Sequence, residues 1–257
     1  MRSTVAAGRD DWEGHWEEFE AAARINPAQA YRRRLILELL AAEGPPARVL
    51  DIGSGTGDLA AAVRRAFPAA ESLGLELSRS GIEASRRKVP EATFVETDIL
   101  KSPHPRPEHR GWATHAVCSE VLEHVESPLR LLRNAMPYLA PGCRVVVTVP
   151  GGPMTAFDRH IGHRRHFRPA EVRALLEAAG FDVDRATGTG FPVFNAYRLA
   201  VRLRGRHVVD DAVSGEASTS AVARGAIRIF DVLLRLQPTR SSRGWQIVAT
   251  ARRRSDR

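Results

Sequence analysis

Short apolar runs alternate with longer amphipathic segments through most of this sequence. The runs are bounded by glycine, proline or polar residues, which is typical of buried strands, and the segments between them carry apolar residues at helical spacing. We predict strands over residues 47–53, 71–78, 92–99, 113–121, 143–150, 181–188 and 244–251. We predict helices over residues 57–67, 80–89, 127–139 and 168–180. Because strands that alternate with helices pair in parallel through right-handed crossovers, this pattern predicts an α/β fold with a mostly parallel sheet.

Helical spacing also marks the region before the first predicted strand. Trp12, Trp16 and Phe19 recur at helical spacing, and a second helix is predicted to begin at Pro27 with Asn26 as its cap. The region therefore adds a helical cap to the core of the domain.

The stretch from residue 190 to 243 departs from the alternation. We predict two amphipathic helices there, at 192–205 and 221–237, joined by a flexible loop at 210–220. This stretch is expected to roof the active site as a lid, to cover a sheet edge, or to form a partner or membrane surface. The chain is thus divided into an N-terminal helical cap (1–44), a core (45–189), a helical insertion or lid (190–243), and a last strand with a basic tail (244–257).

The composition excludes several classes of protein. Of the 257 residues, 43% are hydrophobic and 26% are charged, which is typical of a globular domain. The apolar runs are too short to span a membrane, and charges interrupt the first residues where a signal peptide would be apolar. We therefore expect a cytoplasmic protein without a transmembrane segment. Cys118 and Cys143 lie in apolar surroundings and are predicted to be buried free thiols.

The positive charge of the chain does not by itself indicate a nucleic-acid-binding protein. The formal net charge is +8, and nearly all of the basic residues are arginine, because Lys88 and Lys101 are the only lysines. The arginines are scattered, and no aromatic residues are interleaved with the basic runs, so nucleic acid is disfavoured as a partner. A monomer or homodimer acting on a small molecule is expected.

A glycine-rich loop follows the first predicted strand. Gly53, Gly55 and Gly57 stand between that strand and the next helix, where main-chain amides can cradle a nucleotide. The spacing is G-x-G-x-G instead of the dinucleotide pattern G-x-G-x-x-G, and Asp51 precedes it. An acid sits poorly beside a pyrophosphate, so the loop suits a ligand that carries positive charge.

At this point the sequence resembles the class I S-adenosylmethionine (SAM)-dependent methyltransferases, whose first motif is similar to "VLDIGSGTG". The resemblance covers about residues 31–188 and the last strand, and it implies a Rossmann-like, seven-stranded, mostly parallel sheet with SAM as the cofactor. It implies that Asp51 contacts the methionine end and that Glu76, about twenty residues beyond the glycines, binds the ribose hydroxyls. It also implies that Asp98 accepts from the adenine amine, although a helix cap or loop acid is the alternative for Asp98. The cofactor-binding set predicted in this way is Tyr31, Asp51, Gly53, Ser54, Gly55, Gly57, Glu76, Leu77, Asp98, Ile99, Ser119 and Glu120.

Two segments carry candidate catalytic chemistry. His124 in "EVLEHV" follows the fourth predicted strand, as a similar "LEH" does in many members of the family; it serves either as a general base or only in packing. The connection 151–168 carries His160, His163 and His166, and it leaves the carboxyl end of a strand, where ligands bind in open α/β sheets. It resembles the "D…GH.R.F" segment that borders the substrate pocket in many small-molecule and lipid-type methyltransferases. The predicted catalytic residues are His124, His160 and His163, and the predicted substrate-binding residues are Arg159, His160, Arg164 and His166.

Two alternatives remain open for these segments. The connection 151–168 is alternatively a structural turn, with His163 bonded to the backbone and Arg165 paired to an acid. Glu120, Glu123 and His124, with one histidine of the connection, resemble the metal-binding set of small-RNA 2′-O-methyltransferases. The same helix signature is common in metal-free relatives, so no metal is predicted.

The predicted function is SAM-dependent methyl transfer to oxygen or nitrogen of a small molecule, such as a natural product. The acceptor is expected to be anionic or partly apolar, since arginine and histidine suit a carboxylate or phosphate. One alternative is a methyltransferase scaffold repurposed for elimination or cyclisation. An RNA methyltransferase is a weaker alternative, and a non-catalytic subunit disagrees with the intact cofactor loop.

Overall fold

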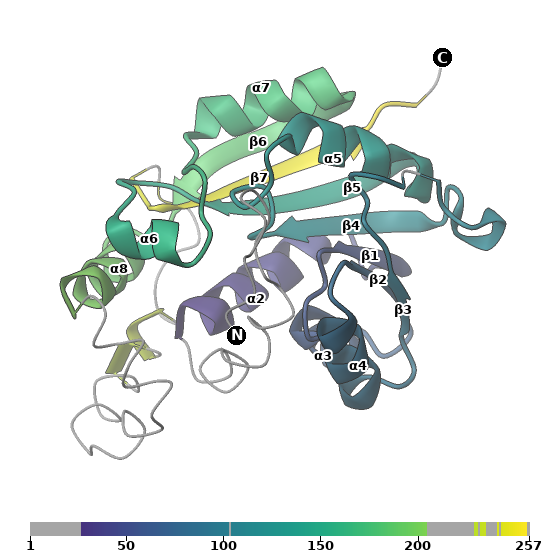
Figure 1. Cartoon of the computed structure of the whole chain (residues 1–257), viewed down its shortest axis with the longest axis horizontal. Helices are drawn as coiled ribbons and strands as arrows, with labels where there is room; N and C mark the ends of the chain where they lie inside the picture. Colours follow the sequence, from purple (N-terminus) through teal and green to yellow (C-terminus); the bar gives the residue numbers. More distant parts are fainter. Residues whose placement is uncertain are drawn as a thin grey trace, which may run out of the picture.

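The computed structural model describes residues 27–102, 104–204, 229–230, 232–234, 241 and 243–255, with residues 156–157 and 201–204 described by their backbone alone (Figure 1). The predicted helix around Trp12 and the loop at 210–220 lie outside these residues. Of the second helix predicted in the insertion, the described residues 229–230 and 232–234 are helical.

A seven-stranded sheet forms the centre of the fold, as predicted. Its order is β3-β2-β1-β4-β5-β7-β6, and β7 pairs antiparallel with both β5 and β6 while the other pairs are parallel. The strands are β1 (Arg48–Ile52), β2 (Glu71–Glu76), β3 (Thr93–Glu96), β4 (Ala113–Ser119), β5 (Leu139–Pro150), β6 (Phe181–Thr189) and β7 (Gln246–Arg253). The chain order reverses between β1 and β4, and such a switch point is where ligands bind in open α/β sheets.

Helices cover both faces of the sheet. Figure 1 shows α5 and α7 above the sheet and α2, α3 and α4 below it. The α-helices are α2 (Pro27–Leu40), α3 (Asp58–Ala66), α4 (Arg79–Lys88), α5 (Pro128–Ala135), α6 (Ala156–His160), α7 (Pro169–Ala179) and α8 (Val193–Arg204); short 3-10 turns are η1 (Pro107–His109) and η2 (Met136–Tyr138). None of the helices among the described residues combines the length and the apolar character that crossing a membrane requires.

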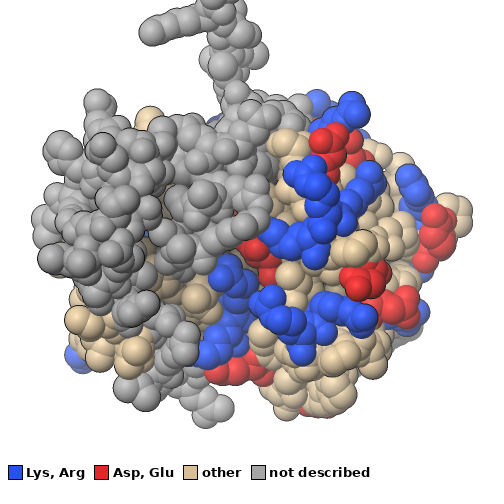
Figure 2. Space-filling view, turned by 90° about the horizontal axis from the view of Figure 1, so that it is seen from below, with Lys and Arg blue, Asp and Glu red and all other residues tan. Residues whose placement is uncertain are grey.

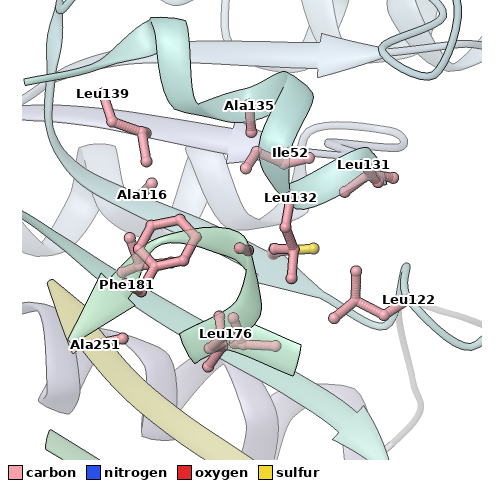
Figure 3. Close-up of a cluster of buried hydrophobic side chains, with 14 of the residues drawn as sticks. Ile52, Ala116, Leu122, Leu131, Leu132, Ala135, Leu139, Leu176, Phe181 and Ala251 are labelled. Atoms are coloured by element: carbon pink, nitrogen blue, oxygen red, sulfur yellow. The ribbon is translucent and has the colours of Figure 1, made fainter. Parts of the chain in front are cut away.

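The largest apolar cluster lies between the sheet and helices α5 and α7. Leu132 of α5 and Leu176 of α7 are buried there against Phe181, at the start of β6 (Figure 3). A second cluster on the other face joins Ile36 of α2 and Val63 of α3 to the sheet. Burial on both faces explains why the central strands are apolar in continuous runs and do not alternate with polar residues.

The fifth strand begins earlier than predicted. The helix expected over 127–139 ends at Ala135, because Pro137 cannot continue it and the chain forms the turn η2 instead. Strand β5 then begins at Leu139, four positions before the predicted strand.

The chain passes very close to the end of β6 just before it enters β7. A Cβ atom placed on Gly244 would lie 1.6 Å from the carbonyl oxygen of Thr189. Glycine is therefore required by space at this position, where the chain leaves the insertion and enters β7.

Candidate functional site

The glycine loop packs against two neighbouring elements. Gly53 and Gly57 adopt φ angles of 76° and 77°, which L-residues with side chains rarely adopt. A Cβ atom on Gly53 would lie 2.5 Å from Cγ2 of Val121, and one on Gly57 would lie 2.8 Å from Cβ of Ser85. The loop thus lies directly beside the segment that follows β4.

Two carboxyl groups lie buried at the carboxyl ends of β1 and β2. Oε2 of Glu76 accepts a hydrogen bond from the amide of Gly55 at 2.7 Å, and Oε1 accepts from the amides of Leu77 and Ser78 at 2.8 and 2.9 Å. Burial, with a further effect of the nearby Glu76 carboxylate, raises the pKa of Asp51 to about 7. The pair forms a buried, electronegative site next to the glycine loop.

The residues predicted to bind adenine lie after β3. Oδ1 of Asp98 accepts a hydrogen bond from the amide of Leu100 at 3.1 Å. Its Oδ2 lies 3.6 Å from Nζ of Lys101. Ile99 is buried, and its carbonyl accepts from the side chain of Asn134 at 2.7 Å. Asp98 therefore orders its own turn, and its predicted role toward adenine stays a prediction.

Ser119 and Glu120 belong to a polar network at the end of β4. Glu120 has a φ of 56°, an uncommon conformation for a residue with a side chain. Its Oε1 accepts from Nε2 of Gln246 at 2.8 Å, and its Oε2 lies 3.3 Å from Nη1 of Arg32. The hydroxyl groups of Ser119 and Thr148 are 2.8 Å apart in the same network.

Tyr31 lies in the core between α2 and α8. Its side chain is 1% exposed, its ring packs 5.5 Å from that of Phe194, and its hydroxyl lies 2.7 Å from Oγ1 of Thr189. This contact holds α2 to β6, and the predicted contact of Tyr31 with the cofactor stays a prediction.

The structure brings three of the four candidate histidines together. The rings of His124 and His163 are 4.8 Å apart, and those of His163 and His166 are 5.3 Å apart. Burial, followed by the neighbouring His124 and His166, lowers the pKa of His163 to about 3, so this imidazole is neutral at physiological pH. His160 and Arg159 are exposed on α6.

Asp158 ties this connection to helix α8. Its Oδ1 pairs with Nη2 of Arg198 at 3.0 Å, its Oδ2 accepts from the amide and hydroxyl of Thr155 at 2.8 and 2.7 Å, and His166 lies 3.7 Å away. The hydrogen bonds and Arg198 outweigh burial and lower the pKa of Asp158. The carboxylate is thus a fixed negative charge between α6 and α8.

The two arginines between the histidines hold the backbone of the segment after β4. Nε of Arg164 donates to the carbonyl of His124 at 2.9 Å, and Nη2 of Arg165 donates to the carbonyl of Glu126 at 3.1 Å. Arg164 was predicted to bind substrate, and that role stays a prediction. Within the described residues, Arg165 bonds this carbonyl and pairs with no acidic side chain.

Glu123 is the most deeply buried acid of the site. It is fully buried, and its Oε1 lies 4.0 Å from Nε2 of His124. Burial and then the charge of Glu120 raise the pKa of Glu123 well above its usual value, while its own main-chain N–H favours the charged form. Neither carboxyl oxygen makes a hydrogen bond of ordinary geometry with another residue of the described chain.

Several residues of this site were missed in the sequence. Arg32, Arg198 and Gln246 converge on Glu120 and Asp158 from α2, α8 and β7. One signal was present for Gln246, since a glutamine inside an apolar strand needs a buried partner. Arg32 and Arg198 gave no such signal, because arginine is an ordinary residue in an amphipathic helix.

Comparison with known proteins agrees with this geometry. Residues 25–186 match the family described as methyltransferase domain. An uncharacterised protein of a Streptomyces fradiae transposon is 31% identical over 69% of this chain and 54% of its own length, so the chain spans about half of that relative. The ubiquinone biosynthesis O-methyltransferase of Marinobacter nauticus is 26% identical over 73% of this chain and 84% of its own. The demethylmenaquinone methyltransferase of Thermus thermophilus is 33% identical over 60% of this chain and 81% of its own.

Two solved structures are similar in fold. Phosphoethanolamine N-methyltransferase 2 of Haemonchus contortus, in complex with SAM, aligns with a TM-score of 0.65 and 17% identity over 98% of this chain and 62% of its own. The cyclase SpnF aligns with a TM-score of 0.64 and 16% identity over 99% of this chain and 100% of its own. The matched family covers more than half of the chain, and the chain therefore belongs to the class I SAM-dependent methyltransferases, enzymes that use SAM as their cofactor.

Proposed function

We propose that this enzyme transfers the methyl group of SAM to oxygen or nitrogen of a small, partly apolar or anionic molecule. The observation that carries the proposal is the packing of Gly53 against Val121. It places the cofactor loop beside the segment that bears Glu123 and His124, so a cofactor on the loop and an acceptor near the histidines lie close together. Methyl transfer requires chiefly that these two groups be held in line.

The residues at the loop fit the cofactor. SAM supplies a methyl group on a positively charged sulfur, together with an ammonium group. Asp51 offers a buried carboxylate to that positive charge, and Glu76 is the proposed partner of the ribose hydroxyls. The positive φ angles of Gly53 and Gly57 shape the loop beside these two acids. Ser54 adds a buried hydroxyl without a hydrogen-bond partner among the described residues, which a ligand can supply.

His124 is the proposed general base for an acceptor hydroxyl. It lies in the histidine cluster, where Arg164 binds its carbonyl and its ring makes an edge contact at 89° with that of His163. His163 and His166 are proposed to orient the acceptor, and the exposed Arg159 and His160 to meet its outer end. The residues 1–44 and 190–243 are proposed as the cap and lid around it.

The names of two relatives support a partly apolar acceptor. They are an O-methyltransferase of ubiquinone biosynthesis and a demethylmenaquinone methyltransferase. The exposed apolar side chains of Phe191 and Leu199, beside or on α8, agree with such an acceptor.

The alternative of a non-methylating reaction draws support from the similarity to the cyclase SpnF, which is a similarity of fold alone. An anionic leaving group would require unpaired basic side chains. Arg32 and Arg198 are instead paired with Glu120 and Asp158, so methyl transfer is the better-supported reaction.

The alternative of an RNA substrate draws less support from the surface. Figure 2 shows basic side chains spread over one face of the molecule with acidic side chains between them. Lys88 pairs with Asp58 at 2.8 Å, and Arg79 pairs with Glu83 at 3.1 Å. Such pairing weakens attraction to a phosphate backbone.

The proposal is tested by calorimetric titration with SAM and with S-adenosylhomocysteine, followed by an acceptor screen that detects methylated products by mass. We expect both ligands to bind, and binding to be lost in Glu76→Gln and retained in Glu96→Gln, an exposed acid at the end of the next strand. Methylated product from a small quinol or phenol would support the proposal. Conversion of an acceptor without any gain of methyl would favour the repurposed scaffold.

The raised pKa of Asp51 predicts that SAM affinity falls below pH 7. In the free protein this carboxyl binds a proton below about pH 7, whereas the positively charged ligand favours its ionised form. Between pH 7 and pH 5, the dissociation constant is therefore expected to rise by up to about tenfold per pH unit. Titrations at three pH values measure this, and the slope should disappear in Asp51→Asn. A flat profile in the wild type would show that Asp51 does not meet the positive charge.

A further inference from the structure

The Glu123 carboxyl lacks the partners that a buried acid requires. It lies between β4 and α5 with no exposed surface, and neither of its oxygens is hydrogen-bonded to another described residue. Burying a polar group without a hydrogen bond is costly, and such a group in a folded protein calls for an explanation.

Two imidazoles lie close to this carboxyl. One nitrogen of His124, one nitrogen of His163 and one oxygen of Glu123 all lie within 4.8 Å of one another. Two histidines and one glutamate form a ligand set found in zinc sites that keep a fourth position open.

The contacts behind His163 occupy one of its two nitrogens. The carbonyl of Gly152 can only accept, so Nδ1 of His166, 3.1 Å away, carries a proton. Nε2 of His166 lies 3.1 Å from Nδ1 of His163, so Nε2 is the nitrogen of His163 that this contact leaves for an ion. A ligating histidine whose other nitrogen is bonded to a second group is the usual arrangement around a metal ion.

A competing set of ligands is already occupied. Asp158, His163 and His166 also lie within 4.8 Å of one another. Asp158, however, is bonded to Thr155 and paired with Arg198, and His166 is bonded to Gly152 and His163. Asp158 and His166 are therefore better placed to hold His163, a metal ligand, in position than to bind a metal ion themselves.

We propose that Glu123, His124 and His163 bind one divalent metal ion of the zinc class. Nitrogen ligands disfavour magnesium and calcium, which prefer oxygen. The sequence alone favoured no metal, and the buried, unsatisfied carboxyl is the observation that changes this. Glu120, which resemblance placed in the metal set, is held by Arg32 and Gln246 instead.

The open position of such an ion lies in the cluster beside the cofactor loop. There it would bind the oxygen of an acceptor and favour its deprotonated form. The ion would then replace His124 as the group that activates the acceptor, because a nitrogen that binds a metal ion cannot also accept a proton. This role rests on the proposed methyl transfer, whereas the metal site itself does not.

The test measures metal binding in the absence of SAM and acceptor. Tag-free protein is treated with a chelator, dialysed, and titrated with Co²⁺ and Zn²⁺, with absorption spectra and calorimetry as readouts. We expect one equivalent to bind, with visible Co²⁺ bands typical of a four-coordinate ion, and Zn²⁺ to displace it. Affinity should fall by about 10- to 100-fold or more in Glu123→Gln and in His163→Ala. His104→Ala, which removes an exposed histidine far from the cluster in sequence, should bind as the wild type does.

Folding of the variants is checked by thermal denaturation of the metal-free proteins. Glu123→Gln keeps the shape of the side chain, so it is expected to fold and to lose only the ion. The proposal is overturned by weak binding of several equivalents that Glu123→Gln leaves unchanged, or by no binding to folded wild-type protein. Because no methyl transfer is measured, either result is independent of the proposed function.

Discussion

Replacement of Asp51 by asparagine is expected to make the protein more stable and to remove most of its affinity for SAM. The carboxyl has a pKa of about 7 in the folded protein and about 4 in the unfolded chain. The unfolded state therefore loses this proton first as pH rises, and the wild type loses stability progressively between about pH 4 and pH 7. Asparagine does not ionise, so the free energy of unfolding at pH 8 should rise on the order of 4 kcal/mol.

Urea denaturation of ligand-free protein at pH 4.5 and pH 8 measures the first half of this expectation. The increase in the free energy of unfolding of Asp51→Asn over the wild type should be small at pH 4.5 and complete at pH 8. Calorimetry with SAM measures the second half, where loss of a charged partner is expected to weaken binding by about 10- to 100-fold. Asp182→Asn, an exposed acid at the start of β6, is the matched control for both measurements. Wild-type affinity in Asp51→Asn would remove Asp51 from the cofactor site.

Replacement of Gly244 by alanine is expected to destabilise the protein by more than about 4 kcal/mol. The added methyl group would lie 1.6 Å from the carbonyl oxygen and 1.9 Å from the carbonyl carbon of Thr189. Both are main-chain atoms, so no side-chain rotation relieves the clash, and the ends of β6 and β7 must move apart. Thr189 pairs with Gln246, which bonds Glu120, so the displacement should also reach the candidate active site.

The control for this change is Gly142→Ala in the exposed first part of β5. No atom lies within 4 Å of a Cβ at Gly142, but its φ of 71° disfavours alanine. Gly142→Ala should lower the free energy of unfolding by about 1 kcal/mol, measured as a modest fall in the midpoint of thermal unfolding. Equal losses in the two variants would mean that the neighbouring strands yield easily to the added methyl group, so that space does not explain the glycine at 244.

Local patterns predicted the fold well because each element carries its own signal. The glycine stop after α7 is one example, since Gly180 ends that helix at a φ of 104°. The proximity of Asp51 and Glu76 was predictable for a similar reason: they lie at the ends of adjacent strands, and the carboxyl ends of parallel strands share one edge of the sheet.

The polar network around Glu120 could not be predicted, because it joins residues that are remote in sequence. Arg32 and Gln246 are separated by 214 positions, yet their side chains meet at 3.5 Å. The spacing of His160, His163 and His166 made them look equivalent, whereas the turn at Gly162 buries one, half-buries another and leaves His160 exposed. Direct contacts of this kind depend on how the elements pack, which no local pattern contains.

The position of β7 has a consequence for the order of assembly on the ribosome. Strand β6 is a sheet edge and pairs with β7, which is synthesised only after the whole stretch 190–243. The five parallel strands can pair as they emerge, but β6 has no place in the sheet until β7 has been translated and inserted beside β5. During that interval α7 must shield one face of β6 while its hydrogen-bonding edges stay open, so the nascent chain is most exposed to aggregation and chaperone binding at this late stage.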